Sequence, residues 1–218
     1  MNDSFYFLAE SYNSNEILRS LIKLIPHGSI IDNKLTNFYT KEKARRLKIF
    51  YDELANGNIQ LTEEVIESDD FIHKYYITLK AVLETRRDEK IQYFARLLKN
   101  SESELVNNPT DYYEDFIKVL DDLTYQELFV LKKLKEKEKE FESLQGRRLM
   151  IHKRFYRKFK IQLSEEIGIT EDEVLSIFIR LGRTGCINLD KNTDQFNQVS
   201  DSIATTDFFK KLETLALT

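Results

Sequence analysis

The sequence predicts a mainly α-helical chain with one small β-hairpin near its C-terminus. Turn-forming residues are scarce, because the 218 residues include 6 Gly and 2 Pro, where average usage would give about 15 and about 11. Apolar residues recur along most of the chain at the three- and four-residue spacing of helix faces. Two Thr-x-x-Glu sequences, at Thr124 and Thr170, have the pattern of helix capping boxes. These observations argue against an all-β fold, whose short strands need many Gly- and Pro-containing turns.

The N-terminal region is predicted to form a helical bundle. Ser14 is expected to cap a helix whose apolar face lies within residues 17–25. Thr40 is expected to open a second helix that ends near Asn56, and a short helix is expected after Thr62. The predicted apolar face of the second helix consists of Ala44, Leu47, Phe50, Tyr51 and Leu54.

The strongest helical periodicity in the chain covers residues 71–98, and it contains one inconsistency. An unbroken phase would place Arg86 and Arg87 on the apolar seam of the helix. An unpaired buried charge is costly. Either the helix breaks near Thr85, or an arginine at the seam pairs with carboxylates, and we favour the break.

Two further helices are predicted before residue 145. Asn108 and Pro109 have the pattern of an N-cap followed by the first helical residue. Thr124 with Glu127 caps a long helix whose middle, residues 132–140, is almost wholly charged. Repulsion between like charges and attraction between opposite charges at four-residue spacing roughly cancel there. We therefore interpret this charged run as a solvated face.

From residue 154 onward, the pattern predicts two helices joined by a tight turn. Gly168 is expected to end the first helix in the left-handed conformation that glycine adopts without strain. Thr170 with Glu173 forms the second capping box, at the start of the next helix. The apolar residues of that helix are Val174, Leu175, Phe178, Ile179 and Leu181.

A β-hairpin and a last helix are predicted to follow. Residues 186–189 form the first strand, the polar residues 190–198 form the tip, and residues 199–204 return as the second strand. Thr205 or Thr206 then caps a helix that carries Phe208, Phe209, Leu212 and Leu215.

The C-terminal third resembles the winged-helix superfamily in this order of elements and in the sequence LSEEIGITEDEVLSIFIRLGRTGCI. The resemblance implies a winged-helix domain over residues 146–218, joined to an all-helical domain over residues 1–145. Many winged helices bind DNA through the N-terminal residues of their second helix. Here those residues are Glu171, Asp172 and Glu173, whose carboxylates would face the phosphates. Because the superfamily also contains protein-binding members, we expect the domain to be used mainly for protein contacts.

A basic stretch precedes the two helices and is the candidate nucleic-acid-binding surface. Residues 1–144 hold 21 Lys and Arg against 27 Asp and Glu, whereas residues 145–218 hold 12 against 10. On a helix, the cations of this stretch would share one face, which either contacts phosphates or faces water or an acidic neighbour. The candidate nucleic-acid-binding residues are Arg147, Arg148, Lys153, Arg154, Arg157, Lys158 and Lys160.

The sequence contains no convincing catalytic or metal-binding pattern. His27, His73 and His152 lie far apart, without the spacing of metal ligands, and no Gly-rich phosphate loop is present. Arg147 and His152 resemble the Arg-x4–6-His motif of HEPN-type ribonucleases, although Arg148 replaces the polar residue that those enzymes favour after the arginine. We therefore expect a protein that is not an enzyme and has no cofactor or metal, with the ribonuclease as a minor alternative.

The cellular location is expected to be cytoplasmic. Cys186 is the single cysteine, so no internal disulfide can form. No signal-peptide pattern and no apolar run of about 18 residues is found, so we expect no association with membranes. A membrane-active effector is a second minor alternative, because the amphipathic residues 17–25 are able to insert into a bilayer. Packing of that face into a protein core is the favoured interpretation.

A second resemblance rests on three segments of the N-terminal region: LIKLIPHGSIIDNKL, KEKARRLKIFYDEL and DDFIHKYYITLKAVLETRRDEKIQYFARLLKN. In these segments the chain resembles uncharacterised all-helical proteins of bacterial chromosomes, prophages and defence regions. The resemblance implies an accessory or interaction role and supplies no functional residues. We expect a non-enzymatic protein that contacts a protein partner within a bacterial or phage assembly, for example an assembly that acts in phage defence. The main alternative is a DNA-binding transcriptional regulator; weak nonspecific nucleic-acid binding and oligomerisation are left open.

Overall fold

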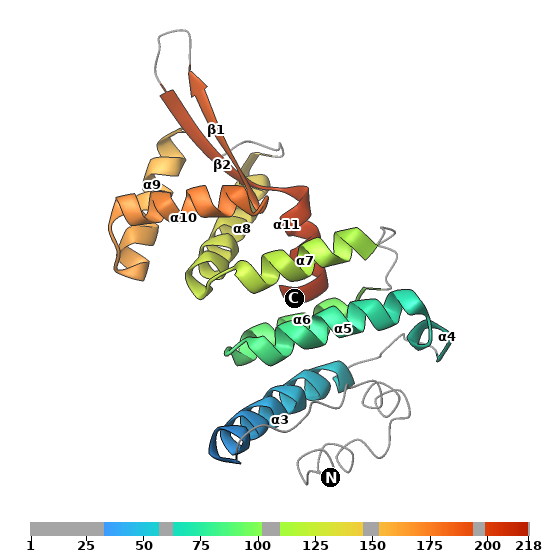
Figure 1. The fold of residues 1–218 in the computed structure, drawn as a ribbon. Helices are drawn as coiled ribbons and strands as arrows, with labels where there is room; N and C mark the ends of the chain where they lie inside the picture. The colour runs from blue at the N-terminus through green and yellow to red at the C-terminus, as the bar shows by residue number, and fades with distance from the viewer. Residues whose placement is uncertain (1–32, 57–62, 102–109, 146–152, 194–198, 218) are drawn as a thin grey trace. The chain divides into compact units, whose positions relative to one another are not determined.

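A computed structural model of the chain describes residues 33–56, 63–101, 110–145, 153–193 and 199–217 (Figure 1). The described residues are mainly helical and include one two-stranded antiparallel sheet near the C-terminus, as the sequence predicts. The chain divides into two compact units. Unit 1 comprises residues 1–121 and 214–218, and unit 2 comprises residues 122–213.

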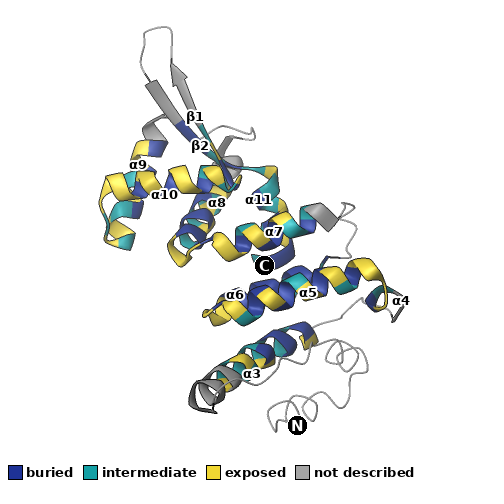
Figure 2. Ribbon diagram, viewed as in Figure 1, coloured by how far each residue is buried: buried dark blue, intermediate teal, exposed yellow. Residues whose placement is uncertain are grey.

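Unit 1 is built from helices that bury aromatic side chains against one another. Helices α3, α5 and α6 pack together, and the Tyr113 hydroxyl of α7 lies 2.6 Å from the Thr78 hydroxyl of α5. The rings of Phe50, Phe71, Phe94 and Phe116 are fully buried, and each contributes about 1.5–3 kcal/mol by leaving water. Figure 2 shows dark blue, buried residues on α3, α5 and α7 beside exposed ones in yellow. The helices of unit 1 are α3 (Asn33–Ala55), α4 (Glu63–Ile66), α5 (Asp69–Glu84), α6 (Asp88–Lys99) and α7 (Thr110–Asp122).

The second predicted helix starts earlier than the sequence indicates. Helix α3 begins at Asn33, so Thr40 lies inside it and does not open it. A threonine costs a helix interior about 0.7 kcal/mol or less relative to alanine, so it does not prevent the helix from extending on its N-terminal side. The predicted apolar face is otherwise confirmed, because four of its members are buried and Ala44 is half-buried: Leu47, Phe50, Tyr51 and Leu54 form the buried set.

The predicted break in the long periodic segment is confirmed. Helix α5 ends at Glu84 and α6 begins at Asp88, which leaves Arg86 and Arg87 exposed at the break. Two arginines of α3 contact the two sides of the break. Arg46 donates to the Leu83 carbonyl in the last turn of α5, and Arg45 lies 2.6 Å from the Asp88 carboxylate in the first turn of α6.

The last residues of the described chain belong to unit 1. They follow helix α11 (Asp207–Leu212) of unit 2 and belong to a π-helical turn, η2 (Glu213–Leu217), in which Leu215 and Ala216 are buried. The Asn100 side-chain amide donates to the Leu215 carbonyl at 2.8 Å. Unit 1 is therefore completed by a segment that lies 115 residues farther along the chain than Asn100.

Unit 2 contains four helices and the hairpin within its described residues. The sequence-based division at 145/146 differs from the division at 121/122, because α8 packs against β2 and α10. A contact across the predicted boundary is specific: the Glu138 carboxylate accepts the backbone N–H of Thr205 at 2.6 Å. The elements of unit 2 are α8 (Tyr125–Gln145), α9 (Lys153–Ile167), α10 (Glu171–Arg183), β1 (Ile187–Thr193), β2 (Val199–Thr205) and α11 (Asp207–Leu212).

The hairpin of unit 2 is longer than the sequence predicts. Strand β1 continues to Thr193, and it pairs with β2 from Ile187 opposite Thr205 to Thr193 opposite Val199. Residues 190–193, predicted as part of the tip, are therefore strand, since antiparallel pairing satisfies their backbone groups whatever the polarity of their side chains. Thr206 caps α11 as predicted, with its side chain accepting the Phe209 N–H at 3.1 Å.

Several predictions fall on residues outside the described ranges. They concern the helix over residues 17–25, the cap at Asn108 and Pro109, the pair of Arg147 and His152, and the hairpin tip over residues 194–198.

Candidate functional site

Helix α10 of unit 2 starts from a turn whose geometry follows directly from its sequence. Gly168 has φ +75°, a left-handed conformation that glycine adopts without strain, and its N–H donates to the Ser164 carbonyl at 2.9 Å. Thr170 then caps α10, because its hydroxyl accepts the Glu173 N–H at 3.3 Å while the Glu173 carboxylate accepts the Thr170 N–H at 2.8 Å. The predicted capping box is confirmed, and it fixes where α10 begins.

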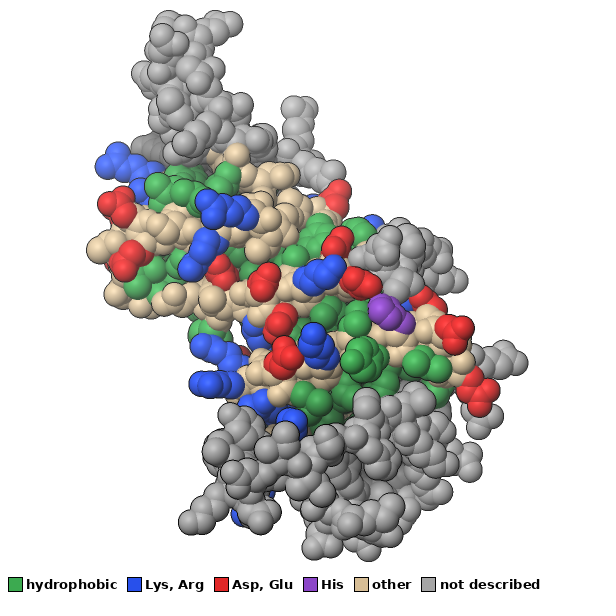
Figure 3. All heavy atoms as spheres, viewed as in Figure 1, with side chains coloured by type: hydrophobic (Ala, Val, Ile, Leu, Met, Phe, Trp, Pro, Cys, Tyr) green, Lys and Arg blue, Asp and Glu red, His purple; other side chains and the backbone are tan. Residues whose placement is uncertain are grey.

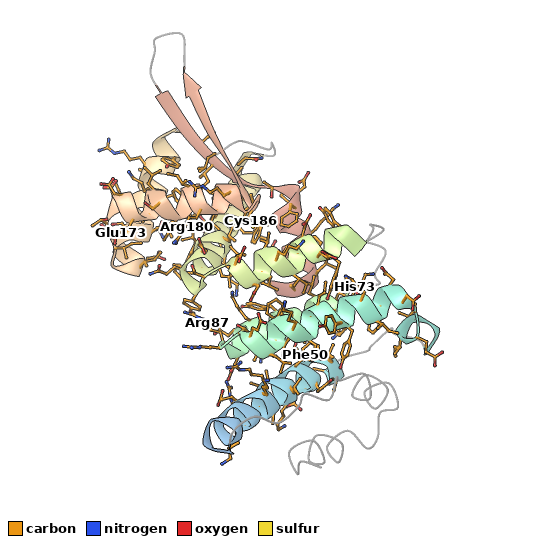
Figure 4. The ribbon with its side chains drawn as sticks, viewed as in Figure 1. Phe50, His73, Arg87, Glu173, Arg180 and Cys186 are labelled. Carbon is orange, nitrogen blue, oxygen red and sulfur yellow. The ribbon has the colours of Figure 1, made fainter. Side chains whose placement is uncertain are left out.

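The first turn of α10 presents three exposed acidic residues. The Glu173 carboxylate is held by Thr170, whose backbone N–H and hydroxyl lower the pKa of Glu173 below its ordinary value. Glu171 lies 2.9 Å from the Lys160 ammonium of α9, and Asp172 is exposed beside it. This end of α10 is therefore anionic, as Figure 3 shows by the red side chains where Figure 4 labels Glu173.

The middle of α10 exposes two large aliphatic side chains. Leu175 is 37% exposed and Ile179 is 45% exposed, although both belong to the apolar set that the sequence predicts. The core side of α10 is instead formed by four residues that are buried: Val174, Ile177, Phe178 and Leu181. The outward face of α10 thus carries an apolar pair between charged ends.

The C-terminal half of α10 carries two exposed arginines. The Arg180 Nε lies 3.0 Å from the Glu127 carboxylate of α8, whose side chain is 6% exposed. Arg183 is exposed in the last turn, where a cation is favourable beside the helix carbonyls. Figure 4 labels Arg180 farther along α10 than Glu173, so the helix runs from an acidic end to a basic end.

The structure describes the side chains of three of the seven candidate nucleic-acid-binding residues, all on α9. Arg157 and Lys158 are exposed on α9, whereas the Lys160 ammonium is paired with Glu171. Lys153 and Arg154 lie in the first turn of α9, and nothing further is described of their side chains. Arg147 and Arg148 lie outside the described residues. Of the described side chains of the predicted basic face, Arg157 and Lys158 are therefore the two exposed ones.

The charged run of α8 is not simply a solvated face, which corrects the sequence-based interpretation. The Glu138 carboxylate accepts hydrogen bonds from both the backbone N–H and the hydroxyl of Thr205 at the end of β2. Lys133 lies 3.5 Å from the Glu166 carboxylate of α9. These contacts join α8 to the hairpin and to α9.

Cys186 lies just before β1 and is fully buried. Burial raises the pKa of its thiol above the ordinary value. The Thr206 N–H donates to the Cys186 carbonyl at 3.0 Å, which closes the base of the hairpin. The burial and the backbone hydrogen bond of Cys186 therefore indicate a structural role.

Within the described ranges, no group of three or more His, Cys, Asp and Glu side chains is arranged to hold a metal ion. His73 is exposed, and its Nε2 lies 3.0 Å from the Glu114 carboxylate of α7. In the same part of the chain, no helix is both long and apolar enough to cross a membrane.

No family model, curated protein or solved structure matches this chain. Among the described residues, the outward face of α10 combines exposed aliphatic side chains with charges of both signs. In a contact with another protein, such a surface would bury the aliphatic pair and pair the flanking charges.

The sequence alone did not reveal two parts of this site. Leu175 and Ile179 follow the helical rhythm of their buried neighbours, and a helix with so many apolar residues exposes some of them whichever face packs inward. The contact between Arg180 and Glu127 joins residues 53 positions apart in the sequence. No local signal marks such a pair.

Proposed function

We propose that this chain is a non-enzymatic protein-interaction module, and that unit 2 is a winged-helix-type domain used for protein contacts. The outward face of α10 carries this proposal. Its middle exposes Leu175 and Ile179, and its first turn exposes carboxylates where a DNA-reading helix would need neutral or basic groups.

The order of elements supports the winged-helix assignment. Helices α9 and α10 are joined by a tight turn at Gly168, and the antiparallel pair β1 and β2 follows α10 directly. Helix α8 supplies a preceding helix that packs against α10 and β2. A helix, a tight turn, a second helix and a hairpin wing in this order are the elements that the superfamily shares.

The electrostatics of α10 favour a protein over DNA. Phosphate contacts come mainly from Lys and Arg side chains, and three carboxylates in the first turn would repel the phosphates there. Arg180 is held by the buried Glu127 carboxylate, which opposes its use as a phosphate ligand. The net charge of −4 adds a repulsive field around the whole chain.

A DNA-binding regulator is the second candidate, and exposed Arg157 and Lys158 on α9 favour it. Their contacts would be with phosphates and so would not depend on sequence.

The resemblance of the N-terminal region to helical proteins of prophages and defence regions leads us to place the module in a bacterial or phage assembly.

A DNA titration separates the two candidates. The full chain is titrated with duplex DNA at about 50 mM and about 200 mM salt, and binding by phosphate contacts alone should fall steeply between them. The variant Arg157→Glu with Lys158→Glu should abolish any residual binding. Lys80→Glu with Lys118→Glu, on exposed side chains of α5 and α7, is the control with the same charge change. Tight, sequence-selective binding at the higher salt would contradict the proposed function.

A further inference from the structure

The outward face of α10 has the residue spacing of a helix that pairs with another helix. Its most outward positions are Asp172, Ser176, Ile179 and Arg183, which follow one another at intervals of four, three and four residues. At 3.6 residues per turn, this spacing places all four on one stripe. The buried residues of α10 occupy the opposite side.

The stripe is also complementary to itself. It starts at the acidic Asp172, passes the aliphatic Ile179 and ends at the basic Arg183. An antiparallel copy of the same helix would therefore meet each charged end with the opposite charge. A parallel copy would set like charges against each other.

We propose that two copies of this chain associate through antiparallel contact of their α10 helices. This inference rests on the proposed function, in which the outward face of α10 binds protein, and it names a second copy of the chain as the partner. A two-fold interface of this kind requires a self-complementary surface, and the stripe meets that requirement.

The rise of the helix fixes which residues meet. With the two-fold axis between residues 177 and 178, Asp172 of one copy and Arg183 of the other both lie about 8 Å from the axis, at a rise of about 1.5 Å per residue. Ile179 of each copy then lies about 2 Å from the axis, so the two isoleucines touch each other across it. Leu175 of each copy lies beside Ile179 of the second copy.

Ser176 allows the two helices to approach. Its side chain is small, and its hydroxyl donates to the Asp172 carbonyl of its own helix at 3.0 Å. Covering Ser176 therefore leaves no hydroxyl proton without an acceptor. Since one helix face buries less than a standard interface, we expect association in the micromolar range or weaker.

Charge reversal provides a sharp test. In Asp172→Arg, both symmetric contacts of the dimer would join two cations, and in Arg183→Asp both would join two carboxylates. Each variant should lose at least about tenfold in association with itself. In an equimolar mixture of the two variants, both contacts again join opposite charges, so a heterodimer should form with close to the original affinity.

The experiment is sedimentation velocity of the full chain over a concentration series from about 1 μM to about 500 μM, a range that brackets the expected affinity. For the mixture, one variant carries a fluorophore. Lys118→Glu, on an exposed side chain of α7, is the control and should sediment like the parent chain. Recovery of the dimer in the mixture also shows that the single variants are folded, because misfolded chains would not regain affinity on mixing.

Three outcomes would overturn the inference: a parent chain that stays monomeric throughout, a dimer that neither charge reversal weakens, and weakened variants whose mixture does not recover. A monomeric chain that also fails to bind DNA selectively leaves the proposed function standing, with a different protein as the partner. Selective DNA binding would instead overturn the proposed function. The sedimentation series measures dimer formation whether or not the chain binds DNA.

Discussion

The Glu127 carboxylate joins two structural roles in one buried side chain. One oxygen accepts the Thr124 N–H at 2.7 Å and so caps α8, while the other lies 3.0 Å from the Arg180 Nε of α10. The start of α8 is thereby tied to the C-terminal half of α10, and Arg180 is held beside the outward face of that helix.

Replacing Glu127 should separate these two roles. Glu127→Gln keeps an acceptor for the Thr124 N–H but loses the ion pair, whereas Glu127→Ala loses both. We expect Glu127→Ala to destabilise unit 2 by about 2–4 kcal/mol, since it removes a buried hydrogen-bonded charge, and Glu127→Gln to cost less. Urea denaturation followed by circular dichroism measures both, and equal losses would contradict the role of the side-chain cap.

Glu138 should matter more than its position in a charged run indicates. Glu138→Ala removes the acceptor of the Thr205 N–H and hydroxyl, and we expect a loss of about 1–3 kcal/mol because these bonds are charge-assisted and half-buried. The control is Glu140→Ala, in the same run on a more exposed side chain, which should cost less than about 0.5 kcal/mol. Thermal melting compares the two, and similar melting temperatures would count against the Glu138 contact.

The capping box at Thr170 should be visible in a titration of Glu173. Hydrogen bonds from Thr170 lower the pKa of Glu173 in the folded chain. The stabilisation is therefore present above the unfolded pKa near 4.5 and is lost as the pH falls through the lower folded pKa. Thr170→Ala removes one donor and should move the pKa of Glu173 upward, which carbon-detected NMR measures. An unchanged pKa would show that the hydroxyl does not bind the carboxylate.

Thr170→Ala should also destabilise α10. Loss of a threonine N-cap costs about 1 kcal/mol in helices of folded proteins. Thr170→Ser retains the hydroxyl and should therefore stay close to the parent chain in urea denaturation. A similar loss of stability in Thr170→Ala and Thr170→Ser would show that the effect does not come from the helix cap.

The Cys186 thiol should react slowly in the folded chain. The thiolate is the reactive form, and burial both raises the pKa of Cys186 and blocks access to it. At pH 8, a disulfide reagent such as dithionitrobenzoate should modify the unfolded chain in urea rapidly and the folded chain only as it opens. Rapid modification without denaturant would contradict the buried position of Cys186.

Local signals in the sequence predicted local features of this fold. The hydroxyls of Thr124 and Thr170 each accept the backbone N–H of the glutamate three residues later. Gly168 adopts the left-handed turn because few other residues do so without strain. The break near Thr85 could be predicted because burying Arg86 or Arg87 is costly whatever surrounds them.

The candidate site depends on contacts that the sequence does not mark. Which side of α10 packs inward is decided by the buried aromatic residues Phe159 and Phe178, whose rings stack with centroids 6.1 Å apart. Leu175 and Ile179 are exposed as a consequence. The partners of Glu138 and Arg180 likewise lie on other elements, so their roles emerge only when the helices are assembled.

The segment that completes unit 1 has a consequence for the order of biosynthesis. Asn100 leaves the ribosome 115 residues before Leu215, the residue whose carbonyl it binds. At bacterial or eukaryotic translation rates of about 5–20 residues per second, this interval lasts roughly 6–23 s. During that time, the nascent unit 1 exposes the surface that Leu215 and Ala216 later cover. Unit 2 ends two residues before Leu215, so both units receive their last residues within about 0.1–0.4 s of each other. The earlier-synthesised unit is thus completed no sooner than the later one.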